Sequence, residues 1–361
     1  MLYHAAFGFT SSWRVFIADR RGAGLRAQML MLAVTCAVFF PLLAGGTLWG
    51  QPVRGSVSPI GVGVAVGAFI FGLGMQLGGG CASGTLFSVG GGSTRMLVTL
   101  FFFVIGSVIG TAHTPWWNAQ PAFAATSMVT MWGPWVGLAV CLAVFAAIAW
   151  LTTVAEKQRH GRLFDRPLAL SEQPRTVGGR WRVEGRWLTG PWPLVAGAIG
   201  LALVNIATLT IGGRPWGVTG AFALWGAKLF AALGIDVASW PYWATPAQAT
   251  ALRSSVLMDV TSVMDFGIIL GALIAAMLAG KFAPVWKVSN RSLAAAVAGG
   301  LLLGYGARIA YGCNIGAYFS GIASGSLHGW LWLVAAFAGN IVGTRLRPLF
   351  DLNVERSQTA C

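Results

Sequence analysis

Two cysteines, Cys81 and Cys313, occupy the same position in two copies of one glycine-rich motif. The copies span residues 72–88 and 304–320, and both read G-x-G-x5-G-C-x2-G-x2-F-S without a gap. A thiol is a soft and weak hydrogen-bond donor, so it can hold a ligand without trapping it. The pair therefore predicts weak, reversible contact with a sulfur-bearing anion, either by S–H donation or by a persulfide-like exchange.

Other thiol chemistry fits the sequence less well. Zinc or iron–sulfur ligation needs further cysteine or histidine nearby, and we expect no metal and no cofactor because the histidines are scattered. They are His4, His113, His160 and His328. A disulfide between Cys81 and Cys313 is geometrically possible, but it would lock a protein that has to move. Cys36 and Cys141 lie within apolar runs, as small buried hydrophobes do, and Cys361 is the last residue.

Each motif interrupts a long apolar run, which indicates where in the fold it lies. The chain is 56% hydrophobic and only 9% charged, so we expect an all-α polytopic membrane protein. About eight full spans are expected, at residues 28–49, 59–79, 96–113, 131–154, 191–211, 258–280, 292–312 and 328–346. Non-helical backbone at membrane depth is tolerated only where protein buries it or where it lines a cavity. A matched pair of interruptions therefore predicts a central binding site.

The charged residues predict the orientation of the chain in the membrane. The net charge of +14 comes from residues that cluster in loops, without a nucleic-acid-binding motif, so no nucleic-acid partner is expected. Residues 155–190 hold eight Lys and Arg, whereas residues 112–130 hold no charged residue. Because basic loops stay on the cytoplasmic side, we expect the 155–190 loop and both termini to be cytoplasmic.

The same topology predicts two repeats of opposite orientation within one integral membrane domain. Residues 1–130 form the first inverted repeat and residues 212–361 the second. Each begins with a broken or re-entrant segment, formed by the first twenty residues in one repeat and by residues 212–233 in the other. Residues 131–211 link the repeats through two spans and the cytoplasmic basic loop.

The residues around each cysteine supply hydrogen-bond donors for an anion. A helix that restarts after a glycine-rich break exposes unpaired N–H groups, which attract negative charge. The candidate substrate-binding residues are Gly80, Cys81, Ser83 and Gly84 in the first motif and Gly312, Cys313, Asn314 and Gly316 in the second. Arg308 lies five residues before Cys313. A basic residue in an apolar run marks a function by default, unless it snorkels or pairs with Asp259 or Asp265.

The paired motif resembles that of the YeeE/YedE sulfur-transport family, bacterial inner-membrane proteins that include thiosulfate uptake transporters. The resemblance extends over essentially the whole chain and includes the R-P-W-G-V-T-G segment that begins at Arg214. It implies a multi-pass inner-membrane protein in which Cys81 and Cys313 contact thiosulfate at a narrow waist. Thiosulfate transporters of the family carry a further cysteine in an F-C-F segment, where this chain has Gly8. Besides membrane lipid, the family implies a small cytosolic TusA-like sulfur-carrier protein as a partner.

The residues leave several functions open. The leading hypothesis is uptake of a small sulfur-containing anion, above all thiosulfate, by a protein that is not an enzyme. A permease for a selenium compound or another sulfur species is the nearest alternative, because of Gly8. A membrane sulfurtransferase would need an acid or a base beside Cys81 or Cys313, and neither motif contains one. An anion or water channel would tolerate serine for both thiols, and a purely structural role would leave the repeated thiols unexplained.

Overall fold

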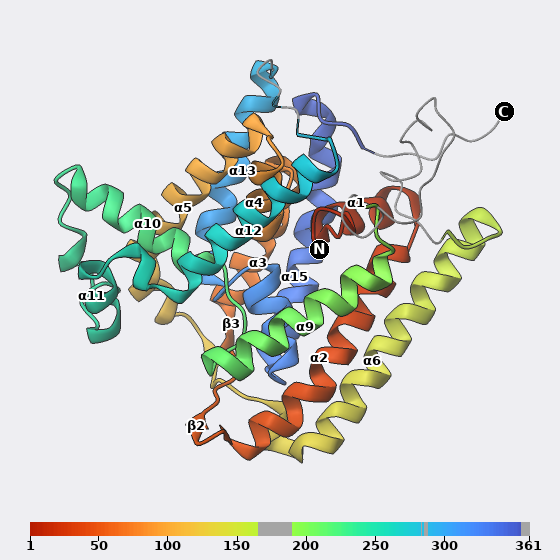
Figure 1. Cartoon of the computed structure of the whole chain (residues 1–361), viewed down its shortest axis with the longest axis horizontal. Helices are drawn as coiled ribbons and strands as arrows, with labels where there is room; N and C mark the ends of the chain where they lie inside the picture. The colour runs from red at the N-terminus through yellow and green to blue at the C-terminus, as the bar shows by residue number, and fades with distance from the viewer. Residues whose placement is uncertain (165–189, 283, 285–287, 355–361) are drawn as a thin grey trace.

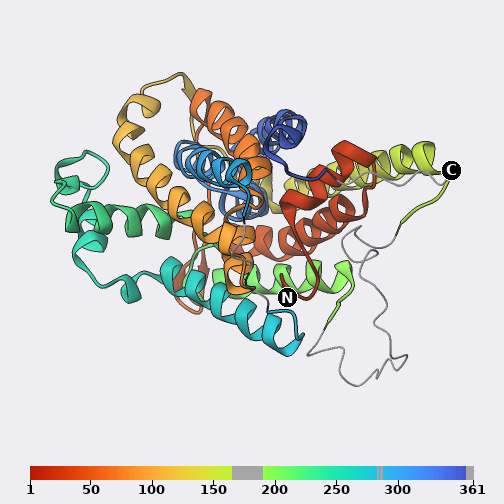
Figure 2. The same ribbon diagram turned by 90° about the horizontal axis from the view of Figure 1, so that it is seen from above.

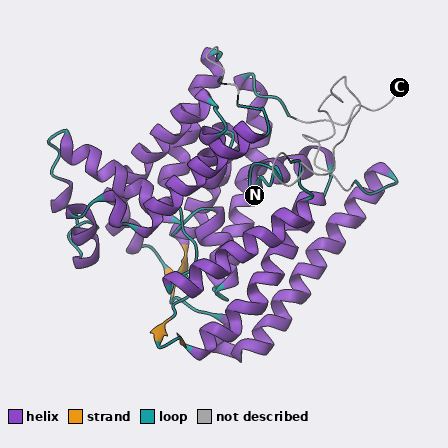
Figure 3. Cartoon of the chain, in the orientation of Figure 1, coloured by secondary structure: helices purple, strands orange, loops and turns teal. Residues whose placement is uncertain are grey.

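The computed structural model describes residues 1–164, 190–282, 284 and 288–354, and these residues are almost entirely helical (Figures 1 and 3). Within them, eight segments are long and apolar enough to cross a membrane. They are α2 (Ala23–Gly45), α3 (Val62–Gly78) with α4 (Ala82–Gly90), α5 (Thr94–Asn118), α6 (Met128–His160), α9 (Leu194–Gly212), α12 (Val260–Leu278), α13 (Asn290–Ile309) with η4 (Asn314–Phe319) and α14 (Ser320–Ala323), and α15 (Leu327–Leu346) with η5 (Arg347–Phe350). The predicted fold class, an all-α polytopic membrane protein, is confirmed.

One short helix leads each of the two halves. α1 (Phe9–Asp19) has 11 residues and α10 (Thr219–Ala232) has 14. Both are too short to cross about 30 Å of hydrocarbon at about 1.5 Å per residue. The other small elements are η2 (Val237–Ser239), α11 (Pro246–Arg253), η3 (Val256–Met258), β1 (Thr47–Leu48), β2 (Gln51–Pro52), β3 (Ile60–Gly61) and β4 (Ala122–Phe123). β1 pairs with β2 and β3 with β4, at one end of the molecule (Figure 3).

Four helices form the centre of the molecule, and glycines bring their backbones close together. α3 and α13 run antiparallel, because Gly67 in α3 lies against Gly306 while Gly74, further along α3, lies against Leu303. A Cβ on Gly74 would lie 2.8 Å from the backbone N of Leu303, so only glycine permits this approach. α15 packs beside α3 and α5 packs beside α13. Small residues at helix contacts are typical of membrane proteins.

The contacts between elements follow a two-fold pattern. α1 packs on α2 and α15, whereas α10 packs on α12 and α5. In the same way, α4 contacts α12, and α14 contacts α2. Each of these contacts therefore has a counterpart in the other half. The two halves meet at the antiparallel pair α3 and α13. The repeat boundaries after residues 130 and 211 stay a prediction, because these contacts do not define them.

The two linking helices share one neighbour in the first half. α6 and α9 both pack on α2. Seen from above, α6 lies at one edge and α10 at the opposite edge (Figure 2). Most of the basic loop predicted at 155–190 lies outside the described residues, as do Cys361 and part of the 281–291 loop.

Candidate functional site

The first cysteine motif breaks a helix where the sequence predicts. α3 ends at Gly78, Gly79 turns the chain in the left-handed region (φ 90°), and α4 begins three residues later. Cys81 caps α4, since its Sγ accepts a hydrogen bond from the Gly84 N–H at 3.3 Å. The Ser83 hydroxyl lies 3.4 Å from the same sulfur. The thiol therefore lies over the N-terminus of a short helix, where N–H groups favour negative charge.

The second motif shares two backbone features with the first. Tyr311 adopts the left-handed conformation (φ 59°) at the motif position that Gly79 occupies in the first copy. The carbonyl of each cysteine accepts a hydrogen bond from the N–H four residues later, at 2.8 Å for Cys81 and at 2.9 Å for Cys313. The turn and the first helical hydrogen bond are thus repeated, although a tyrosine replaces glycine at the turn and η4 is a π-helix whereas α4 is an α-helix.

A glycine precedes each cysteine for a steric reason that is the same in both copies. A Cβ on Gly80 would lie 3.0 Å from the backbone N of Thr85. A Cβ on Gly312 would lie 2.8 Å from the backbone N of Ala317, also five residues later, and the φ of Gly312 is +149°. Each glycine therefore lets the chain pass closely over the start of the next helix.

The two breaks lie together inside the protein. η4, which begins directly after Cys313, contacts α4, which begins directly after Cys81. Cys81 is 2% exposed and Cys313 is fully buried. Both thiols are therefore buried in the interior, each at the start of one of two short helices that touch.

Two buried amide side chains beside the second break have atoms without partners among the described residues. The Asn314 side chain is fully buried, and neither its Nδ2 nor its Oδ1 makes a hydrogen bond. Gln28 on α2 accepts from Trp13 Nε1 at 2.9 Å and from the Tyr318 hydroxyl at 3.5 Å, but its Nε2 has no acceptor. Buried polar groups nearly always find a partner, so these atoms are suited to a ligand. Gln28 is not among the residues predicted from the sequence, although an amide at the start of an apolar span is a signal for it.

Arg308 and its motif counterpart Gln76 make structural contacts. The Arg308 guanidinium donates to the Tyr242 hydroxyl at 3.1 Å and lies 5.2 Å from the centroid of that ring. Gln76 Nε2 donates to the Thr10 carbonyl at 3.2 Å and to Asn340 Oδ1 at 2.6 Å. Of the predicted site residues, the motif residues gather around the two thiols, whereas Arg308 contacts the segment that follows α10.

An extended segment between α2 and α3 covers the second break. The Ser56 N–H donates to the Ser324 hydroxyl at 2.9 Å, and the Ser56 hydroxyl donates to the Gly316 carbonyl at 3.4 Å. The Ser58 N–H donates to the Ser326 hydroxyl at 3.4 Å. These few polar contacts separate Gly316 from the face that the charge pattern predicts to be external.

An arginine on α5 holds the end of α3 just before the first break. Arg95 donates to the Gly78 carbonyl at 2.7 Å, to the Leu77 carbonyl at 2.6 Å and to the Ser292 hydroxyl at 2.8 Å. A cation at a helix C-terminus satisfies carbonyls that have no partner within the helix. Arg95 therefore fixes the direction in which the chain enters the Cys81 turn.

Gly8 directly precedes a residue that contacts the second break. The space that a Gly8 side chain would fill is taken by Ser11, whose Oγ lies 2.5 Å from the Cβ position. The adjacent Phe9 ring meets the Tyr318 ring edge-on, with the centroids 6.1 Å apart. The segment that carries a further cysteine in thiosulfate transporters of the resembled family thus carries a serine hydroxyl here.

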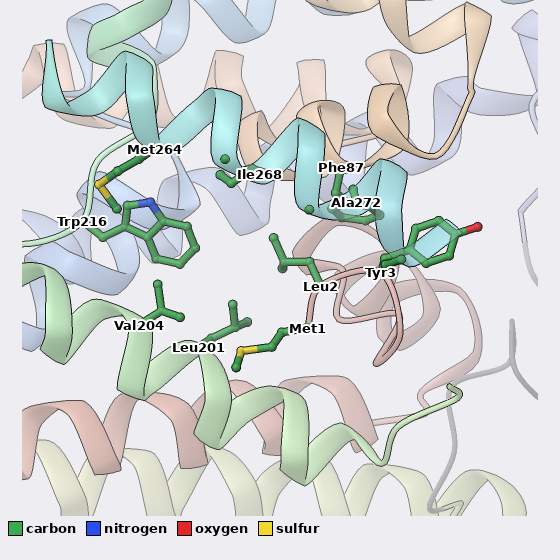
Figure 4. Close-up of a pocket in the computed structure, with 13 residues that line it drawn as sticks. Met1, Leu2, Tyr3, Phe87, Leu201, Val204, Trp216, Met264, Ile268 and Ala272 are labelled. Atoms are coloured by element: carbon green, nitrogen blue, oxygen red, sulfur yellow. The ribbon is translucent and has the colours of Figure 1, made fainter. Parts of the chain in front are cut away.

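A pocket of about 320 Å³ lies away from the thiols, between the N-terminal residues, α9 and α12 (Figure 4). Its lining is largely apolar and includes Leu2, Leu201, Met264 and Ile268. The Trp216 indole N–H is buried there without a partner among the described residues. A charged anion would lose its hydration in such a lining without compensation. The candidate site therefore lies at the two breaks and not in this pocket.

Two broken helices that meet inside a polytopic membrane protein are typical of the binding site of a transporter. The chain belongs to the Sulphur transport family, whose model it matches over residues 4–342. The resemblance seen in the sequence is thereby confirmed.

Named relatives agree with this family. Thiosulfate transporter TsuA of Spirochaeta thermophila is 26% identical over 352 residues, which cover 92% of this chain and 90% of the relative. TsuA of Escherichia coli (strain K12) is 25% identical over 354 residues, covering 94% and 88%. The probable transporter YedE of Escherichia coli is 31% identical over 176 residues, which are 48% of this chain and only 43% of that relative. These relatives are named as transporters and not as enzymes.

Proposed function

We propose that this chain takes up thiosulfate across the bacterial inner membrane, through a central constriction that Cys81 and Cys313 line. The observation that supports the proposal is the repeated break, in which a buried cysteine directly precedes a short helix in each half. The likeness to thiosulfate transporter TsuA over nine-tenths of both chains supports thiosulfate as the substrate.

The chemistry of the site suits a dianion that contains a terminal sulfur. N–H groups of the first turns of α4 and η4, together with Ser83 and Asn314, replace part of the hydration that the anion loses. The thiols add weak donors to the terminal sulfur, so the anion is held without being trapped. Arg308 acts from a distance, because its positive charge raises the anion concentration near the predicted outer end of α13.

The charge pattern completes the proposal. With both termini and the 155–190 loop on the cytoplasmic side, the substrate leaves toward that loop, where a small TusA-like sulfur carrier can receive its sulfur. The glycine at position 8 favours one second candidate, a permease for a selenium compound or another sulfur species. A growth assay on single sulfur or selenium sources separates the two candidates.

Serine at either motif cysteine tests the contact directly. Cys81→Ser and Cys313→Ser keep the size of the side chain but replace the soft sulfur by a harder hydroxyl. We expect each to lower thiosulfate-dependent growth and initial uptake about tenfold, the equivalent of about 1.4 kcal/mol, while protein levels in the membrane stay unchanged. Uptake of radiolabelled thiosulfate by cells that lack other sulfate and thiosulfate importers is the measurement.

The two buried cysteines outside the motifs are matched controls. Cys36 and Cys141 lie within spans, and the hydrogen bonds of their sulfurs to the Ile322 carbonyl at 3.9 Å and to the Met128 sulfur at 4.0 Å are long. Cys36→Ser and Cys141→Ser should therefore transport nearly like the parent. Wild-type uptake by both motif serine variants would exclude sulfur contact and favour a plain anion channel.

A further inference from the structure

The two-fold arrangement pairs Gln28 of α2 with Asp265 of α12. Each is the sixth residue of its helix. In each half a tryptophan of the short leading helix bonds to this span: Trp13 Nε1 donates to Gln28, and Trp225 Nε1 donates to the Ser262 hydroxyl at 2.9 Å, about one turn before Asp265. One half therefore carries an amide, and the other half carries a carboxyl group, at corresponding places beside the breaks.

The Asp265 carboxyl group is buried, and no hydrogen bond in the described chain offsets the loss of its hydration. The residue has no exposed surface, and neither of its carboxyl oxygens has a hydrogen-bond partner among the described residues. Its helix packs against α4, the short helix that Cys81 begins. Ile269 and Ala272, about one and two turns further along α12, lie against Gly90 at the end of α4. Asp265 thus lies on the helix that packs on α4 and, within the described residues, is not part of an ion pair.

The groups around Asp265 offer it no cation within the described residues. Lys228 on α10 donates its ammonium protons to the carbonyls of Leu252 and Ser254. Asp259, at the start of α12, accepts from the N–H and the hydroxyl of Ser262 and is itself acidic. Arg214 donates to the Thr261 hydroxyl. The other titratable groups on the neighbouring elements are the thiols of Cys81 and Cys313, and the Met1 amino group and the Tyr3 hydroxyl at the pocket.

We propose that Asp265 is the proton-binding site that couples anion uptake to a proton gradient, an inference that rests on the proposed function. A buried carboxylate without a cation is so costly that the group takes up a proton instead. A dianion that enters a negatively charged cell also moves against the membrane potential. When the site opens outward, the carboxylate binds one external proton; when it opens inward, it releases that proton with the substrate. One proton and one thiosulfate cross together, and the net charge moved falls from −2 to −1.

Accumulation in proteoliposomes at zero membrane potential measures this coupling. The purified full chain is reconstituted with equal K⁺ on both sides and valinomycin, at pH 7.5 inside and pH 6.5 outside, and radiolabelled thiosulfate is added. One coupled proton predicts about tenfold accumulation inside for one pH unit. Asp265→Asn keeps the shape but cannot exchange a proton, so its thiosulfate should only equilibrate. Asp236→Asn, at an exposed carboxylate in the segment after α10, is the matched control and should accumulate like the parent.

Each outcome decides one question. Tenfold accumulation by Asp265→Asn, or equilibration without accumulation by the unmodified protein, would overturn the assignment while leaving thiosulfate transport intact. Absence of any uptake by the unmodified protein would instead contradict the proposed function itself. If Asp265→Asn does not fold, Asp265→Glu must still accumulate thiosulfate. A pH dye in vesicles of the unmodified chain must also report one proton entering with each thiosulfate, and a silent dye excludes the coupling.

Discussion

The glycine before each cysteine determines how closely the chain can pass over the following helix. At Gly312 two costs add up, since φ is +149° and a Cβ would approach the Ala317 backbone at 2.8 Å. At Gly80 the space is slightly larger, with 3.0 Å to the Thr85 backbone, and φ is not in the left-handed region. The two glycines therefore have the same role, but a Cβ costs more at Gly312 than at Gly80.

Alanine substitutions should reveal this inequality. Gly312→Ala has to strain the backbone or move the η4 helix, which costs about 1–3 kcal/mol, so we expect a lower unfolding temperature and strongly reduced uptake. Gly80→Ala should have the same effects to a smaller extent. Gly220→Ala is the control, because a Cβ there meets nothing within 4 Å. Equal loss of uptake in all three variants would show that the close approach of Gly80 and Gly312 to the next helix does not explain why glycine is needed there.

At the scale of elements, glycine contacts hold the central helices together. A Cβ on Gly339 of α15 would overlap the Phe69 carbonyl of α3, and a Cβ on Gly299 of α13 would overlap the backbone at Gly78. The four central helices therefore pack backbone against backbone, and van der Waals contact replaces the hydrophobic effect that lipid does not supply. This packing positions the ends of α3 and α13, from which the two breaks begin.

Filling one of these contacts should destabilise the bundle. Gly339→Ala forces α15 away from α3, and overpacking of this kind costs about 1–3 kcal/mol. We expect a lower unfolding temperature in detergent and a smaller folded fraction by size-exclusion chromatography. Gly271→Ala in α12 provides the comparison, since its Cβ would meet nothing within 4 Å, and it should unfold like the parent. An unchanged unfolding temperature for Gly339→Ala would contradict the close packing of α3 and α15.

The sequence predicted the spans and both breaks, but not the partners of the polar residues. Length and hydropathy are enough to locate a membrane helix, and the repeated motif marks where each break falls. The direction of Arg308 toward Tyr242 could not be predicted, because an apolar helix has no polar face that would indicate which side is buried. The contacts of Arg95 with carbonyls of α3 depend on how separate helices pack, which residue spacing does not encode.

At the scale of the whole molecule, the equivalent helices α3 and α13 run antiparallel, in keeping with the predicted inversion of the two halves. The charge pattern predicts that residues 112–130 are external and that residues 155–190 are cytoplasmic. The described structure adds that β3 and β4 pair residues 60–61 with 122–123, so the loops before α3 and after α5 lie on the same side. The cover over the second break lies in the first of these loops.

Thiol labelling in intact cells tests the orientation. Ala124→Cys, at an exposed position after β4, should react with a membrane-impermeant maleimide added outside. Arg162→Cys, exposed after α6, should react only after the membrane is opened. The four described native cysteines are buried, which limits background. The reverse labelling pattern would invert the topology and place both termini outside.

Tyr311 has a mechanical consequence for the pair of halves. The left-handed turn before the first break uses glycine at no steric cost, whereas the same turn before the second break holds a tyrosine at φ 59°. Such a residue stores about 1–3 kcal/mol, which corresponds to a bias of about 5- to 150-fold toward any conformation that relaxes it. The turn before the second break therefore stores backbone strain, and the turn before the first break does not. The two halves of a duplicated architecture are thus energetically unequal at their breaks, and any conformation that relaxes Tyr311 is favoured by the stored energy.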